Sequence, residues 1–308
     1  MADVTLERWG TRFRSPVVLA SGPAGFGLEL LDGVDLSRIG ALTTKTITPA
    51  PRTGNPQPRL VDCPAGALNS IGLDNPGLEA FRARILPRMD DLPTHVILSV
   101  TGPSADAAAR VVASLAEAPA THMIELNLSC PNVSGGLIGA DAEAVFAYVR
   151  KARSAFDGVL LAKLPGDAGD LLAAAGASLD AGADGVTLIN SLRGMRIDWT
   201  SGRPFLKSIF GGLSGPAILP IALARVYDVR RAFPDAVIIG TGGVVELGSL
   251  VEMLMAGADL VGIGFGLMAD PQVGCRLTAE LGRWLDERGM QSVSEILGVA
   301  QEGNGDVP

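Results

Sequence analysis

The chain has 308 residues, of which 47% are hydrophobic, and its formal net charge is −8 at pH 7. It contains no cluster of Lys and Arg, so we expect no nucleic-acid partner. It also contains no run of about 18 apolar residues and no signal-peptide layout at its start, so we expect no membrane association and a cytoplasmic protein.

Short apolar runs alternate with helical patterns along the chain. The predicted strands are Val17–Ala20, Ala41–Lys45, His95–Val100, His122–Asn127, Val159–Leu164, Gly185–Asn190, Val237–Gly240 and Leu260–Ile263. The predicted helices are Leu78–Met89, Ala105–Leu115, Ala142–Phe156, Ala168–Ala181, Ile218–Phe233, Leu247–Ala256 and Pro271–Glu287. Continuous apolar strands separated by helices indicate a parallel sheet. Eight such units favour an α/β fold of the (β/α)8 TIM-barrel type in a single domain, residues 1–308, with an open doubly wound sheet as the alternative.

Three segments lie outside this alternation. Val4–Arg14 is typical of a short hairpin, which we expect to close the floor of the barrel. Thr46–Gly77 and Ser191–Gly215 are too long for ordinary connections. Both follow the C-terminal end of a predicted strand, where barrels build their active sites, so we expect insertions that form walls or lids of a pocket. The alternative is that they are insertions without a function.

The stretch after the fourth predicted strand is the most polar strand end. Asn127, Ser129, Cys130 and Asn132 place two amides, a hydroxyl and a thiol directly after a buried run. Because buried polar groups cost free energy unless they are paired, this pattern favours a site. The alternative is a polar turn that caps its own backbone.

Other strand ends favour the binding of an anion. Lys45 and Lys163 end buried strands, and a buried Lys requires an anionic partner. The glycine pair Gly242-Gly243 and Gly264 follow the seventh and eighth strands, where barrels often hold phosphate. A phosphate site, two cations and several amides match flavin mononucleotide, FMN. The three cysteines are scattered and form no C-x-x-C pair, so we expect no metal site.

Several motifs together resemble one family. They are Thr44-Lys45-Thr46, Gly54-Asn55-Pro56, Asn69-Ser70-Ile71-Gly72-Leu73-Asp74-Asn75-Pro76-Gly77, Asn127-Leu128-Ser129-Cys130-Pro131-Asn132, Asn190-Ser191-Leu192-Arg193-Gly194-Met195, Ile197-Asp198, Gly211-Gly212-Leu213-Ser214-Gly215-Pro216 and Gly240-Thr241-Gly242-Gly243-Val244. The chain resembles the dihydroorotate dehydrogenase family, specifically its class 1 enzymes whose catalytic chain pairs with an FAD and iron–sulfur subunit. The membrane-bound class carries Ser at the position of Cys130 and an N-terminal membrane extension, so we expect this chain not to belong to that class.

The resemblance implies dihydroorotate oxidation in pyrimidine biosynthesis. Cys130 would remove the proton from C5 of dihydroorotate as general base, and the hydride from C6 would pass to N5 of FMN. Substrate would be bound by Lys45, Asn69, Ile71, Gly72, Leu73, Asn127, Asn132, Asn190 and Ser191. FMN would be bound by Ala20, Ser21, Thr44, Lys45, Ser99, Asn127, Lys163, Ile189, Gly215, Gly242, Gly243, Gly264 and Phe265.

Two departures from the family pattern leave alternatives open. Ser99 stands where the family usually has Asn, and Phe265 where it usually has a small hydroxylated residue. Both concern the flavin site and are compatible with a paralogue that oxidises another dihydropyrimidine. A non-catalytic binding barrel is a third hypothesis.

The resemblance also predicts how electrons leave. We expect a homodimer, or a heterotetramer with an FAD and iron–sulfur subunit that passes electrons to NAD⁺. The sequence itself has no G-x-G-x-x-G nicotinamide fingerprint. Fumarate is the rival electron acceptor.

Overall fold

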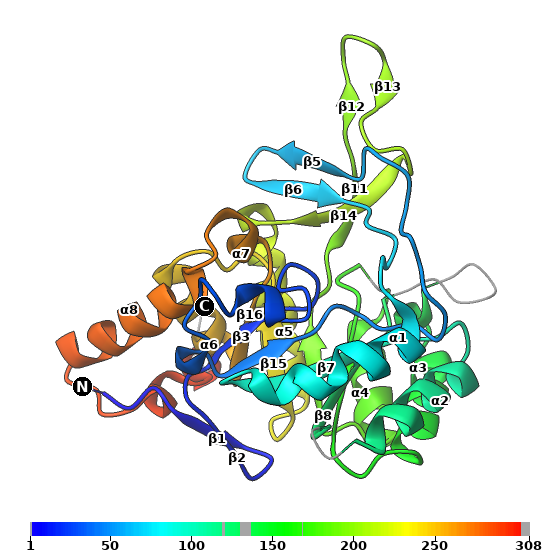
Figure 1. Cartoon of the computed structure of the whole chain (residues 1–308). Coiled ribbons are helices and arrows are strands. Elements are labelled where there is room, and N and C mark those ends of the chain that lie inside the picture. The colour runs from blue at the N-terminus through cyan, green and yellow to red at the C-terminus, as the bar shows by residue number, and fades with distance from the viewer. Residues whose placement is uncertain (1, 119–120, 130–136, 168, 303–308) are drawn as a thin grey trace.

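The computed structural model describes residues 2–118, 121–129, 137–167 and 169–302 (Figure 1). Its centre is a closed barrel of parallel strands in the order β3-β4-β7-β8-β9-β10-β15-β16, closing on β3. These strands are Val17–Leu19, Ala41–Thr43, His95–Val100, Met123–Asn127, Val159–Lys163, Gly185–Leu188, Val237–Thr241 and Leu260–Ile263. Each predicted strand is present, with its ends within two residues of the prediction. The predicted TIM barrel is therefore confirmed.

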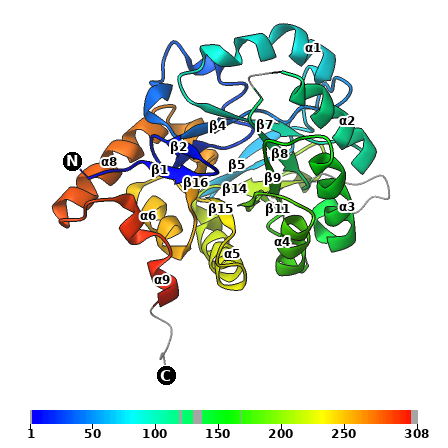
Figure 2. The ribbon, with the colours of Figure 1, turned by 90° about the horizontal axis from the view of Figure 1, so that it is seen from below.

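The barrel strands are mainly apolar on both faces because side chains fill the barrel and helices cover it from outside (Figure 2). The helices are α1 Gly77–Arg84, α2 Ala105–Ala116, α3 Ala142–Arg153, α4 Leu171–Asp180, α5 Leu219–Ala232, α6 Leu247–Ala256, α7 Phe265–Ala269, α8 Val273–Glu287 and α9 Val299–Glu302. Ser104, Asp141 and Asp170 start α2, α3 and α4 by accepting hydrogen bonds from backbone N–H groups of the first turn. No helix among the described residues is both long and apolar enough to cross a membrane.

One predicted helix is divided in two. The sequence pattern predicts a continuous helix over Leu78–Met89, whereas the structure has α1 followed by the 3-10 helix η3, Leu86–Asp91. Pro87 explains the break, because proline has no N–H to continue the α-helical hydrogen bonds and its ring clashes with the preceding turn. The other predicted helices agree with the structure to within three residues at each end. The predicted start at Ala168 lies outside the described residues.

The N-terminal hairpin closes the barrel floor as expected. Strands β1, Leu6–Arg8, and β2, Thr11–Phe13, pair antiparallel below the barrel (Figure 1). The indole nitrogen of Trp9 donates to the backbone oxygen of Asp184 at 2.9 Å, just before β10. Arg8 pairs with Asp259 at 2.7 Å, just before β16. Both contacts lie at the N-terminal ends of barrel strands, opposite the face where active sites are built.

The two long insertions combine into one antiparallel sheet above the barrel (Figure 1). Its order is β11-β14-β6-β5, with β5 Leu60–Cys63 and β6 Gly66–Asn69 from the first insertion, and β11 Leu192–Met195 and β14 Phe210–Ser214 from the second. We call this sheet the cap. The hairpin of β12, Ile197–Asp198, and β13, Arg203–Pro204, projects from it and carries Trp199, which is 91% exposed.

Candidate active site

A cavity of about 720 Å³ lies between the C-terminal ends of the barrel strands and the cap. This volume is in the range of small-molecule sites in proteins. Its lining combines strand ends β3, β4, β8, β9, β10, β15 and β16 with residues of both insertions. The insertions therefore form walls of a pocket.

The structure brings together most of the residues that the sequence assigns to substrate and cofactor. The cavity is lined by Ala20, Ser21, Lys45, Asn69, Ile71, Gly72, Leu73, Asn127, Lys163, Ile189, Asn190, Ser191, Gly215, Gly242, Gly243, Gly264 and Phe265. Thr44 and Ser99 are buried directly behind this lining, where the Ser99 amide donates to the Thr44 hydroxyl at 3.1 Å. Cys130 and Asn132 lie outside the described residues.

Thr46 connects three of these strand ends and was not assigned a role from the sequence. Its hydroxyl accepts a hydrogen bond from Asn127 Nδ2 at 3.1 Å and shares a hydrogen bond with Ser99 Oγ at 3.0 Å. Ser21 Oγ lies 3.4 Å away on the other side. The side chain of Asn127 is thus held by a neighbour that comes from the first insertion.

We expect Thr46→Val to disturb the site while it conserves side-chain shape. The Asn127 amide loses its acceptor, and a buried donor without a partner costs about 1–3 kcal/mol. Thermal unfolding should therefore occur at a lower temperature, and substrate should bind more weakly. Thr53→Val is the matched control, since Thr53 is exposed in the same insertion and its hydroxyl makes no hydrogen bond among the described residues. Equal unfolding temperatures for the two variants would contradict the role of Thr46.

Amides and hydroxyls form a second network on the β8 and β10 side. Ser129 Oγ donates to Asn127 Oδ1 at 2.5 Å, and Asn190 Nδ2 donates to Ser129 Oγ. On the cap side, Asn69 Nδ2 donates to the backbone oxygen of Gly212 at 3.3 Å. Amides fixed in this way offer both donors and acceptors to a polar ring. The sequence places Ser129 among the polar residues that favour a site after the fourth predicted strand, but Ser129 was assigned no binding role there.

The cavity carries excess positive charge. Lys45 and Lys163 line it, and neither makes an ion pair within the described part of the chain. Two arginines that sequence reasoning missed also line it: Arg59 pairs with Asp74 at 3.1 Å, whereas Arg52 donates only to the backbone oxygen of Gly72 at 3.2 Å. Lys45, Lys163 and Arg52 have no carboxylate in contact among the described residues, and on a protein of net charge −8 they favour an anionic ligand at this position.

The glycines after β15 and β16 form a cradle suited to phosphate. No backbone acceptor in the described residues takes the N–H of Gly242, Gly243 or Gly264. Gly243 has φ +81°, and a Cβ there would lie 2.6 Å from Leu219 Cβ, so only glycine fits this turn. Free N–H groups in a tight turn are the donors that phosphate oxygens require.

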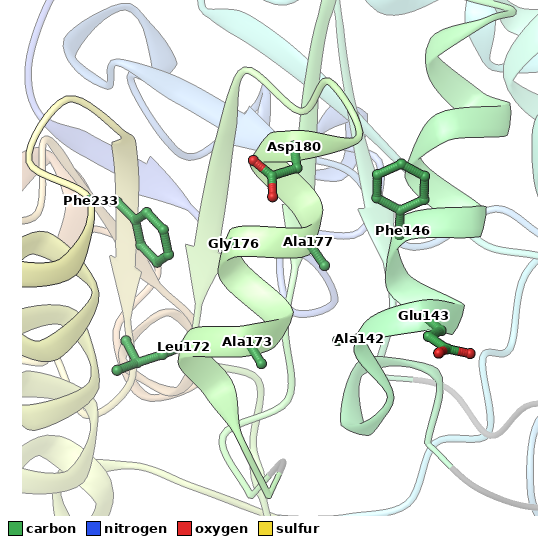
Figure 3. Close-up of a pocket in the computed structure, with 9 residues that line it drawn as sticks. All are labelled: Ala142, Glu143, Phe146, Leu172, Ala173, Gly176, Ala177, Asp180 and Phe233. Carbon is green, nitrogen blue, oxygen red and sulfur yellow. The ribbon is translucent and has the colours of Figure 1, made fainter.

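A second hollow of about 640 Å³ lies on the outside of the barrel, between neighbouring helices (Figure 3). Phe146 of α3, Leu172 of α4 and Phe233 after α5 give it a mainly apolar lining. It contains none of the residues assigned to the site, and its lining comes from helix residues and Phe233 rather than from barrel strands. We therefore take the cavity below the cap as the candidate active site.

The remaining described cysteines lie away from that cavity. Cys63 belongs to β5 and Cys275 is buried in α8, where burial raises the pKa of its thiol. Among the described residues, no group of His, Cys, Asp and Glu is arranged to hold a metal ion.

Fold and site together define a (β/α)8-barrel protein with a cavity at its C-terminal face that is lined by cationic side chains and side-chain amides. Comparison with known proteins then specifies the family. The dihydroorotate dehydrogenase family matches residues 3–285, and the chain belongs to it.

Similar curated proteins carry the same name. The chain is 40% identical to the "Dihydroorotate dehydrogenase B (NAD(+)), catalytic subunit" of Pelobacter propionicus, with 97% of this chain and 99% of that protein covered. It is 38% identical to the Bacteroides fragilis protein of the same name, with 98% of this chain and 100% of that protein covered. Among solved structures, dihydroorotate dehydrogenase of Eimeria tenella in complex with ferulenol has the same fold, with a TM-score of 0.80 and 22% identity over 97% of this chain and 89% of that one.

Proposed function

We propose that this chain oxidises dihydroorotate to orotate in pyrimidine biosynthesis, with FMN as its cofactor. The observation that carries the proposal is the convergence of Lys45, Lys163, the amides and the glycine cradle on one cavity. Membership of the family and the names of the relatives support the same reaction. They give no support to another dihydropyrimidine as substrate.

Dihydroorotate dehydrogenases are in general flavin-dependent. The described residues suit FMN in particular, because the cradle of Gly242, Gly243 and Gly264 offers free N–H groups to a phosphate. Lys163 would stand beside the ring, where a cation favours the negative charge of the reduced form. FMN, when bound, would accept the hydride from C6 of dihydroorotate.

The remaining chemistry falls to side chains of this chain. Asn69, Asn127 and Asn190 would orient the pyrimidine ring by hydrogen bonds, and Lys45 would bind its carboxylate. Cys130, together with Asn132, belongs to the segment outside the described residues. We assign to the Cys130 thiolate the removal of the C5 proton, since a thiol of ordinary pKa near 8.5 is a workable base close to neutral pH.

We further propose that electrons leave to NAD⁺ through a second subunit. The relatives are named as NAD⁺-dependent catalytic subunits, which implies a companion chain for those proteins. By this analogy the chain would form a homodimer that joins an FAD and iron–sulfur subunit in the cytoplasm.

The decisive experiment has three stages. The purified chain should be yellow, and heat-released flavin should have the mass of FMN. Anaerobic dihydroorotate should bleach the flavin, whereas dihydrouracil, which lacks the carboxylate for Lys45, should bleach it far more slowly. NAD⁺ should be reduced only when the FAD and iron–sulfur subunit is added.

Each stage has a contradicting result. A colourless protein that binds no added FMN would refute the cofactor, and equal bleaching by both pyrimidines would refute the substrate. Rapid turnover with fumarate by the chain alone would refute the proposed electron acceptor.

A further inference from the structure

Glu125 is a buried carboxylate for which the proposed reaction has no use. It lies in β8, two residues before Asn127, and is 1% exposed. Its Oε2 accepts a hydrogen bond from Thr187 Oγ1 of β10 at 2.8 Å, while its Oε1 is buried and has no hydrogen-bond partner among the described residues. An orphaned buried acceptor is costly, and an ionised one more so, unless a positive charge lies close by.

The strand register places Glu125 and Lys163 on the inner faces of two adjacent strands. In β9, Lys163 pairs in register with Asn127 of β8 and with Thr187 of β10. Residues in register on parallel strands face the same side, and Asn127 and Lys163 both line the cavity. The bond from Glu125 to Thr187 therefore crosses the inner face of β9 beside the stem of Lys163.

Two of the buried charged side chains have no ion pair among the described residues. Among the described residues, three charged side chains are buried: Glu125, Lys163 and Asp259. Asp259 is neutralised by Arg8 at 2.7 Å and Arg230 at 2.6 Å, on the barrel floor. Glu125 and Lys163 remain, with opposite charges, on adjacent strands, and neither has an ion-pair partner within the part of the chain that the structure describes.

We propose that Glu125 is the buried counter-charge of Lys163, a positioning residue beneath the active site. Its negative charge stabilises the Lys163 ammonium inside the barrel and partly offsets the positive field that this ammonium presents to the cavity. The inference deepens the proposed function and rests on it, because the offset field acts on the FMN proposed to bind there. Glu125 would thus hold the reduction potential of the flavin lower than Lys163 alone would set it.

Glu125→Gln tests the effect on the flavin, because it removes the charge and keeps a side-chain oxygen for Thr187. Reduced FMN should gain about tenfold in affinity relative to oxidised FMN. For a two-electron couple this ratio corresponds to a rise of about 30 mV in the midpoint potential. The matched control is Glu252→Gln, which removes a carboxylate from the exposed face of α6 and should leave the potential unchanged. A Glu125→Gln potential equal to that of the wild type would overturn the proposal.

A double-mutant cycle tests the charge pair through stability, which needs no flavin signal. Thermal unfolding is measured on the proteins as purified, for Glu125→Gln, Lys163→Met and the double variant. Each single variant leaves one buried charge alone, so its unfolding temperature should fall by at least about 5 °C. The double variant buries neither charge, so its unfolding temperature should fall by less than the sum of the decreases in the two single variants.

The outcomes separate this inference from the proposed function. If the decreases in unfolding temperature of the two single variants add up to that of the double variant, the proposed pairing of Glu125 with Lys163 is refuted. If Glu125→Gln does not fold, recovery of folded protein in the double variant supports the pair, and its absence overturns it. A wild-type chain that binds no FMN would refute the proposed function, while the cycle would still decide whether Glu125 and Lys163 are coupled.

Discussion

Cys130→Ala is expected to slow the reduction of bound flavin by dihydroorotate at least about 10²-fold, the usual scale for the loss of a general base. FMN should remain bound, because the proposed cofactor contacts come from other residues. Anaerobic stopped-flow measurement of flavin bleaching would give the rate directly. The bleaching rate of Cys130→Ser should lie between those of the wild type and Cys130→Ala, because a serine hydroxyl can occupy the place of the thiol but is a far weaker base.

Cys63→Ala is the control for this variant. Cys63 is half-buried in β5 of the cap and does not line the cavity, so its removal should leave the bleaching rate unchanged. Near-normal bleaching by Cys130→Ala would refute Cys130 as the base. Lost stability with an unchanged rate would instead identify it as a structural cysteine.

Gly243→Ala is expected to have the second largest effect, on cofactor retention. The added Cβ would lie 2.6 Å from Leu219 Cβ and 2.7 Å from Leu219 Cα at the start of α5. Leu219 Cα is a backbone atom that cannot rotate away, and Gly243 has φ +81°, which alanine rarely adopts. The turn must therefore move, and its N–H groups move with it. Loss of one hydrogen bond to a charged phosphate costs about 1.5–3 kcal/mol, so FMN should bind roughly 10- to 100-fold more weakly.

Gly248→Ala provides the comparison for this variant. Gly248 lies in the first turn of α6, and a Cβ there would meet nothing within 4 Å. Alanine is the better helix former, so we expect unchanged FMN affinity and a gain of up to about 1 kcal/mol in stability. Titration of the flavin-free proteins with FMN, followed by fluorescence, measures both variants. Equal affinities would mean that the phosphate binds elsewhere.

The sequence by itself determined the barrel and the face that carries the chemistry. Runs such as Leu260–Ile263 are apolar at every position, which indicates strands buried on both sides, and the intervening helical periods set their parallel order. Because parallel strands end at the same face, the sequence was enough to predict that Lys45, Asn127 and Lys163 meet. These are local patterns, and the elements predicted from them agree with the structure because each strand or helix is specified by its own residues.

Only the tertiary structure decided how distant segments pair. The cap forms because Ala67 and Leu68 pair with Ser214 and Leu213, almost 150 residues away, and no periodicity encodes such a partner. The partners of Glu125 likewise cannot be identified from the sequence alone. A carboxylate inside the run Met123–Leu126 is visible as an exception in the sequence, but its bond to Thr187 and its place beside Lys163 depend on strand register. Register follows from the closure of the whole barrel, so the sequence alone could identify the buried charge but not its partner.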